Sequence, residues 1–169
     1  TQDQPRISGP SKPDETAKFP EIMVGVWEAD VGRHSKWGIK FEADGSISKI
    51  IHSIAGPVNI AEGGVSQEGP ENSYYIFEIR PCEVNYTPGT GIVDVKIIVD
   101  QYEMQVPLGL FEGRIEDYIS GPVSEDGKTW EAKWRRYGWL EGSAPPPKDI
   151  IDANPISLVF TKVELGEMQ

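Results

Sequence analysis

The chain has 169 residues, of which 16 are basic and 27 acidic, so its formal net charge at pH 7 is −11. This charge repels nucleic-acid phosphates, which binding proteins neutralise with clustered Lys and Arg, and no run approaches the roughly 18 apolar residues of a membrane-spanning helix. The one cysteine, Cys82, excludes an internal disulfide and a thiolate-rich zinc or iron–sulfur site. We therefore expect no nucleic-acid partner, no transmembrane segment and no cofactor.

The composition indicates an all-β fold. Ile and Val, whose β-branched side chains pack well on a pleated surface, greatly outnumber Leu and Ala. With 18 Gly and 14 Pro, the chain has the turn residues that short antiparallel strands require. Its hydrophobic content of 38% is enough for one core, so we predict a single domain over residues 21–165. The expected architecture is an antiparallel up-and-down β-barrel of eight or nine strands, with a β-sandwich or jelly roll as the alternative.

Residues 1–20 differ in character from the rest of the chain. They contain four prolines, few apolar side chains and no periodicity, so they bury too little surface to offset the entropy of ordering. We interpret them as a disordered N-terminal tether. A polar, Pro-rich leader that starts without Met is typical of a chain whose secretion signal has been removed, and a trimmed cytoplasmic chain would look the same. The expectation is an exported protein (periplasmic, outer-membrane-anchored or secreted), with a membrane tether through this segment.

Alternating apolar residues predict the strands in chain order. In the first half they cover residues 22–27, 37–41, 47–51, 58–65 and 74–79. Asp44-Gly45 makes the tight turn of a hairpin, and Pro81 ends the last of these strands. On the second strand Trp37 shares a face with Ile39 and Phe41, and we include Trp37 among the candidate ligand-binding residues.

The second half continues the pattern. Strands are predicted over residues 92–99, 102–106, 111–119, 130–137 and 156–163. We place a turn near Asp100 and a tight turn at Asp126-Gly127. Residues 145–147 are all Pro and predict an extended spacer, after which residues 148–154 form one helical turn.

Three short features form a pattern across the chain. They are Gly25-Val26-Trp27 on the first strand, Glu116-Asp117-Tyr118 late in the domain, and Arg135 or Arg136 on the following strand. The pattern resembles the lipocalin-like, or calycin, family of up-and-down β-barrels that hold a small ligand. The three features correspond to the family's Gly-x-Trp signature, to its Thr-Asp-Tyr motif with Glu in place of Thr, and to the Arg that packs across the first-strand Trp. The resemblance implies that Gly25, Trp27 and Arg136 are structural. It predicts a fully buried Trp27 that closes one end of the barrel with an Arg stacked on its ring, and a Gly25 that lets a neighbouring chain approach closely.

The densest aromatic and basic cluster lies on the strand over residues 130–137 and just beyond it. Alternation places Trp130, Ala132, Trp134 and Arg136 on one face, and Glu131, Lys133, Arg135, Tyr137 and Trp139 on the other. The row Arg135, Tyr137 and Trp139 has the residue types of binding hot spots, so we identify it as a candidate ligand site. The alternative is that this row packs under the Pro-rich segment 145–147.

Asp117 is a further candidate ligand-binding residue because it shares a face with Phe111, Ile115 and Ile119. A carboxylate among apolar side chains must be paired, hydrogen-bonded or protonated, and the alternative is a strand-end Asp that holds a turn. His34 and His52 lack a metal-binding spacing and are expected to be solvent-exposed, so we predict no metal site. Cys82 is expected to behave as a small apolar residue.

Three functional hypotheses follow from these residues. The first is a non-catalytic binding protein that holds a small apolar or aromatic ligand inside the barrel. The second is a carbohydrate- or protein-binding surface module, in which Arg135, Tyr137 and Trp139 form an exposed, coplanar platform. The third is an acid–base enzyme with Asp117 or Glu112 as the proton-transfer group and Arg114 or a histidine as its partner, although no catalytic motif appears in the sequence.

Overall fold

The computed structural model describes residues 19–33, 35–53, 57–59, 65–68 and 73–163, and within these ranges eleven strands form one antiparallel sheet. The first six strands are β1 (Gly25–Val31), β2 (Ser35–Phe41), β3 (Ile47–Ser53), β4 (Pro57–Asn59), β5 (Val65–Glu68) and β6 (Tyr74–Ile79). The remaining five are β7 (Glu83–Thr87), β8 (Ile92–Val106), β9 (Gly109–Pro122), β10 (Thr129–Leu140) and β11 (Ile156–Val163). A 3-10 turn η1 (Glu21–Met23) precedes β1, and a helix α1 (Lys148–Ala153) lies between β10 and β11.

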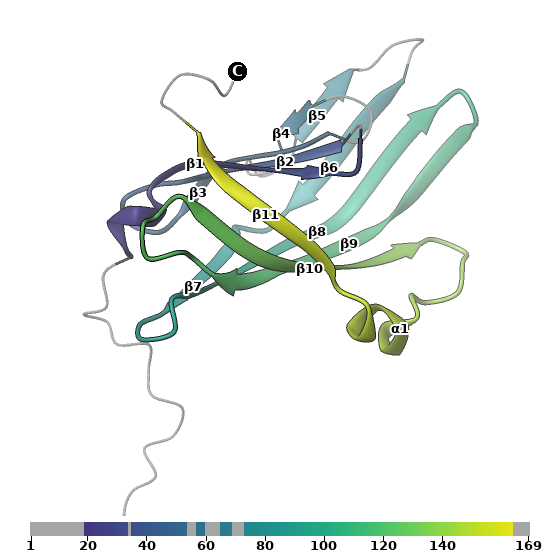
Figure 1. Cartoon of the computed structure of the whole chain (residues 1–169). Helices are drawn as coiled ribbons and strands as arrows, with labels where there is room; N and C mark the ends of the chain where they lie inside the picture. The colour runs from purple at the N-terminus through teal and green to yellow at the C-terminus, as the bar shows by residue number, and fades with distance from the viewer. Residues whose placement is uncertain (1–18, 34, 54–56, 60–64, 69–72, 164–169) are drawn as a thin grey trace, which may run out of the picture.

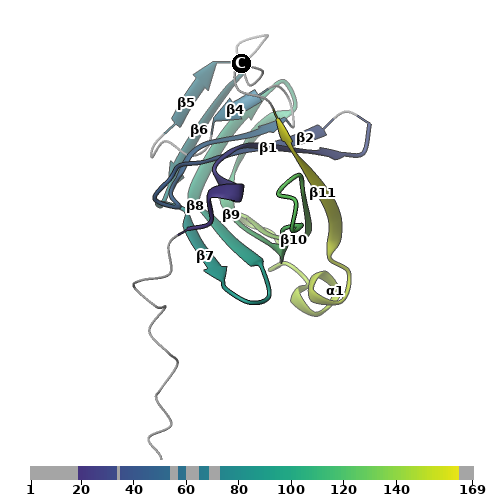
Figure 2. The same cartoon turned by 60° about the vertical axis from the view of Figure 1, so that its left-hand side comes forward.

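The strands follow one another around the sheet almost in the order of the sequence. The order is β4, β3, β2, β1, β11, β10, β9, β8, β6 and β5, and β7 pairs with β8 as well. Because β1 pairs with β11, the two ends of the domain meet, and the sheet curls around its own interior (Figures 1 and 2). The expected all-β, antiparallel, barrel-like fold is therefore confirmed.

Alternation along the strands decides which side chains fill the interior. The largest fully buried side chains come from β1, β2, β10 and β11 and include Trp27, Trp37, Phe41, Trp130 and Phe160. The Trp130 ring packs edge-on against Phe41, with ring centroids 5.8 Å apart, and stacks on Phe160 at 4.6 Å. Aromatic rings of this size bury large apolar areas. This part of the barrel is thus filled by a packed core.

The strand boundaries differ from the sequence prediction in two places. No turn occurs near Asp100, because β8 runs unbroken from Ile92 to Val106 and absorbs the extra residues as an irregularity between Val99 and Tyr102. Strand β7, which pairs with the first half of β8, was not predicted from the sequence. The predicted strand over residues 58–65 lies largely outside the described residues.

The helical and terminal predictions have mixed outcomes. Helix α1 confirms the helical turn predicted after the Pro run. Most of the predicted tether lies outside the described residues, but Phe19, within it, stacks on Phe41 of the core at 5.6 Å. In the described part of the chain, no helix has the length and apolar character needed to span a membrane.

Candidate binding groove

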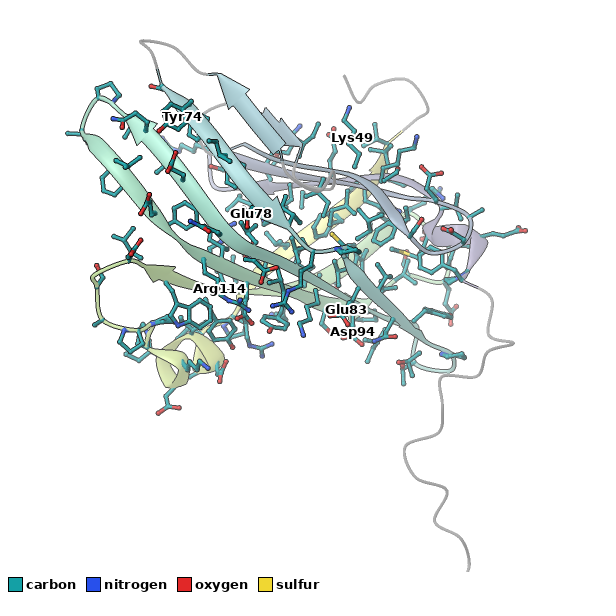
Figure 3. All side chains as sticks on the ribbon, turned by 180° about the vertical axis from the view of Figure 1, so that it is seen from behind. Lys49, Tyr74, Glu78, Glu83, Asp94 and Arg114 are labelled. Atoms are coloured by element: carbon teal, nitrogen blue, oxygen red, sulfur yellow. The ribbon has the colours of Figure 1, made fainter. Side chains whose placement is uncertain are left out.

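A groove of about 770 Å³ lies on the outer face of the sheet, over β7, β8, β9 and β10, with α1 as one wall. Outward-facing side chains of the strands line it because successive residues of a strand point to opposite faces. Three of them are aromatic: Tyr118 of β9, and Tyr137 and Trp139 of β10. Figure 3 shows this side of the molecule, where Glu83 and Asp94 lie close together and Arg114 lies nearer to α1.

The three aromatic rings form a continuous row. Tyr118 and Tyr137 meet edge to face, with centroids 5.6 Å apart, and Tyr137 and Trp139 follow at 6.4 Å with their planes inclined by 34°. Trp139 is half-buried and keeps part of its surface exposed. The predicted coplanar arrangement of the platform is wrong, because the rings are inclined to one another.

Two cations flank the Trp139 ring. The guanidinium carbon of Arg114 and the Nζ of Lys148 each lie 5.8 Å from its centroid. A cation over an aromatic face is attracted by the ring quadrupole. These contacts connect α1 to the sheet and hold Trp139 at one end of the groove.

Hydroxyls and cations bind the carboxylates around the groove. Glu116 accepts hydrogen bonds from Arg114 at 2.9 Å and from Tyr118 at 2.5 Å. Tyr137 donates to Asp152 of α1, and Ser120 donates to Asp94. Lys96 lies 3.4 Å from Glu83.

These contacts shift the acidity of the lining groups. Partial burial opposes ionisation of Glu116, but the hydrogen bonds from Tyr118 and Arg114 outweigh it and lower the pKa of Glu116. Burial and the bond to Glu116 raise the pKa of Tyr118 to about 12, and the bond to Asp152 together with burial raises the pKa of Tyr137. At neutral pH the groove therefore presents neutral phenols and an ionised Glu116.

The candidate ligand-binding residues of the sequence analysis lie on both sides of the barrel wall. Arg135, Tyr137 and Trp139 line the groove together, as alternation predicts. Trp37 and Asp117 lie on the inner face and are buried, with 0% and 1% of their surface exposed. The structure does not bring these two sets into one site.

Asp117 is the carboxylate of a buried cluster inside the barrel. It accepts hydrogen bonds from Arg136 Nε at 2.8 Å, Arg136 Nη2 at 3.0 Å and Trp134 Nε1 at 2.8 Å. Asp117 and Arg136 are direct cross-strand partners in the middle of β9 and β10. Asp117 is thus paired, as one reading of the sequence required, and the alternative of a strand-end Asp that holds a turn is wrong.

The barrel end at Trp27 agrees with the sequence prediction except for the cation. Trp27 is fully buried and donates from Nε1 to the Met23 carbonyl at 2.9 Å. The cation over its ring is Lys162 of β11, 5.7 Å from the centroid, whereas Arg136 lies over Trp134 at 5.1 Å. The predicted stacking of Arg135 or Arg136 on Trp27 is therefore wrong, because Asp117 holds Arg136 in the middle of the sheet.

Gly25 has the close approach expected of it. Its φ is +124°, a value that L side chains rarely adopt, and a Cβ there would lie 3.2 Å from Cε of Lys162. The neighbour that comes close is thus the Lys162 side chain, which also donates to the Ile22 carbonyl at 2.8 Å. Gly25 makes room for the lysine that covers this end of the barrel.

The structure separates Arg114 from Asp117, one of the acid–base pairs considered in the sequence. Arg114 binds Glu116 and Asp100 on the outer face, so it is not a partner of Asp117 on the inner face. Burial raises the pKa of the Cys82 thiol to about 11, which leaves it protonated at neutral pH. The described part of the chain holds no group of three or more His, Cys, Asp or Glu side chains arranged for a metal ion. His34 and the side chain of His52 lie outside the described residues.

The wall of the groove formed by α1 was not predicted from the sequence. Lys148 and Asp152 are four residues apart, a spacing that places two side chains on one face of a helix, so the predicted helical turn held this signal. Glu116 and Tyr118 are also found by strict alternation, since they point away from the Asp117 face. No sequence pattern shows that α1 folds back beside β10 (Figure 1).

Comparisons with protein-family models, with curated proteins and with solved structures return no match to this chain.

Proposed function

We propose that this protein is a non-catalytic binding protein that holds a carbohydrate in the groove on the outer face of β7 to β10. The observation that carries the proposal is the row of three aromatic rings along a groove of about 770 Å³. This volume falls within the range of about 300 to 1,000 Å³ that is typical of small-molecule sites. Sugar rings stack their apolar C–H faces on aromatic rings, and their hydroxyls bond to polar side chains beside them.

The polar side chains of the groove suit a ligand rich in hydroxyls. Carboxylates and cations line the groove together with the rings, so a bound sugar finds acceptors in Asp94 and Asp152 and donors in Arg135 and Lys148. The inclination of 34° between Tyr137 and Trp139 supports successive sugar rings of a twisted chain better than one flat ligand. A purely apolar ligand would remove water from Arg135 and Lys148 without offering them a hydrogen-bond acceptor, which is costly.

The hypothesis of a small apolar ligand inside the barrel stays a prediction, as does the lipocalin-like resemblance that supports it. The described interior between β1, β2, β10 and β11 is occupied by core aromatic side chains. Mass spectrometry of small molecules extracted from the purified protein tests this hypothesis separately from the groove.

The test of the proposed function is binding of the full chain to an array of neutral and acidic oligosaccharides, followed by calorimetry on the glycans that bind. We expect Trp139→Ala to weaken binding by about tenfold or more, because truncation of an aromatic anchor in a binding site commonly costs more than about 1 kcal/mol and often about 2 kcal/mol or more. Trp139→Phe, which keeps a ring, should retain part of the affinity. Leu108→Ala is the matched control, since Leu108 is 90% exposed but lies in the turn between β8 and β9, away from the groove. Absence of glycan binding, or equal binding by Trp139→Ala, contradicts the proposal.

A further inference from the structure

The cations of the groove are not equivalent. Lys96 has an ion pair with Glu83, and Arg114 has ion pairs with Glu116 and Asp100. Among the described residues, neither Arg135 nor Lys148 has an ion pair with a carboxylate. Two carboxylates that line the groove with them have other partners, Glu116 in Arg114 and Tyr118, and Asp152 in Tyr137.

The two cations without an ion pair, Arg135 and Lys148, lie beside opposite ends of the Tyr137–Trp139 row. Arg135 comes first, Tyr137 and Trp139 follow on the same face, and Lys148 of α1 lies 5.8 Å from the Trp139 centroid. Alternate residues of a strand are about 6.6 Å apart, so Arg135 and Trp139 are separated by about 13 Å along β10. The stretch of β10 between Arg135 and Trp139 is thus longer than one sugar ring.

We propose that the ligand of the groove is an acidic oligosaccharide whose carboxylates bind Arg135 and Lys148 while its rings stack on Tyr137 and Trp139. The inference rests on the proposed function and specifies its ligand class. A guanidinium matches a carboxylate with two parallel hydrogen bonds, and a hydrogen bond between charged groups is stronger than one between neutral groups. The groove is also lined by Glu83, Asp94, Glu116 and Asp152, so we expect only those ligand carboxylates that meet Arg135 or Lys148 to be attracted.

The test compares two forms of one ligand by calorimetry on the full chain. The probes are trigalacturonic acid and its fully methyl-esterified form, which has the same rings without the charges. The variants are Arg135→Gln and Lys148→Gln, and Lys133→Gln is the matched control because Lys133 is exposed on the same face of β10, outside the groove lining.

We expect the acid to bind about tenfold or more tightly than the ester, since each charge-assisted hydrogen bond contributes at least that factor. Arg135→Gln and Lys148→Gln should each weaken binding of the acid by about tenfold and weaken binding of the ester much less, because Gln keeps a donor for neutral sugar oxygens but loses the positive charge, and Lys133→Gln should change neither. Equal affinity for acid and ester, or an acid affinity that neither groove variant lowers, overturns the inference. If the array shows binding of neutral glycans only, this inference fails and the proposed function stands; if it shows no binding of any glycan, both fail.

Discussion

Trp27 and Lys162 form a contact between a buried aromatic ring and an exposed cation. Trp27 is fully buried, bonded to the Met23 carbonyl and covered by the Lys162 ammonium. Lys162 is exposed and contributes through its contact with the ring and its bond to Ile22. The Trp27 indole therefore contributes buried apolar area, whereas Lys162 contributes a cation–π contact over the indole ring.

Replacing Trp27 by Ala should destabilise the protein by about 3 to 5 kcal/mol, because the change removes a large buried ring and leaves a cavity. Lys162→Ala should cost less than about 2 kcal/mol, the upper range of a cation–π contact. Urea denaturation followed by tryptophan fluorescence measures both values. A midpoint that hardly moves in Trp27→Ala would refute the barrel-closing role of Trp27.

The pairing of Asp117 with Arg136 links β9 to β10 at the scale of secondary-structure elements. Asp117→Ala should reduce the free energy of unfolding by about 3 kcal/mol, the lower end of the range for a broken buried ion pair, since the Arg136 side chain is 27% exposed. The control is Lys36→Ala, which breaks the ion pair between Lys36 and Glu28. The Lys36 side chain is 51% exposed and the Glu28 side chain 26%, so loss of this pair should cost less than about 1 kcal/mol. The two variants are compared by urea denaturation at pH 7. Equal costs would mean that burial does not set the strength of the Asp117 pair.

The side chains of Glu103, Glu112 and Glu141 lie close together near the hairpin between β8 and β9. Glu112 lies opposite Glu103 in the register, and hydrogen bonds with Glu141 and Glu103 raise the pKa of Glu112 above its ordinary value. A carboxyl with a raised pKa in the folded state stabilises that state while it is protonated, and this stabilisation is lost as pH rises through the raised pKa. Glu112→Gln should therefore raise the melting temperature relative to wild type at pH 7, and the difference should vanish near pH 4.

Thermal unfolding by circular dichroism at the two pH values measures this effect. Glu125→Gln is the control, because it removes the same charge from an exposed turn residue. If Glu125→Gln matches Glu112→Gln at pH 7, relief of the overall negative charge explains the gain, and repulsion among the three glutamates does not.

Alternation predicted most strands and the two faces of β10, because a half-buried strand encodes its orientation with a period of two. The sequence could not reveal that β8 continues through Asp100, since that position has the polar character of a turn. The structure instead holds the Asp100 carboxylate between Arg80 and Arg114, residues that are distant in sequence. The row Arg135, Tyr137 and Trp139 was predictable because its residues alternate along one strand. Its position beside α1 was not, because that position depends on packing between residues that are distant in sequence.

At the scale of the whole molecule, the curled sheet separates two chemical environments. Its inner face holds the aromatic core and the Asp117 pair, and its outer face holds the groove. The five tryptophans report on both faces, because Trp27, Trp37, Trp130 and Trp134 are buried in the interior and Trp139 lines the groove. A ligand in the groove and a ligand inside the barrel must therefore affect different indoles.

The most direct test of the groove as the binding site is NMR of the five indole Nε1–H resonances during titration with trigalacturonic acid and, separately, with its methyl ester. We predict that the Trp139 resonance shifts with saturation and that the four interior resonances stay in place. Shifts of the Trp37 or Trp134 resonances without a shift of Trp139 would place the ligand inside the barrel. That result, or the absence of any shift with either probe, would contradict the account.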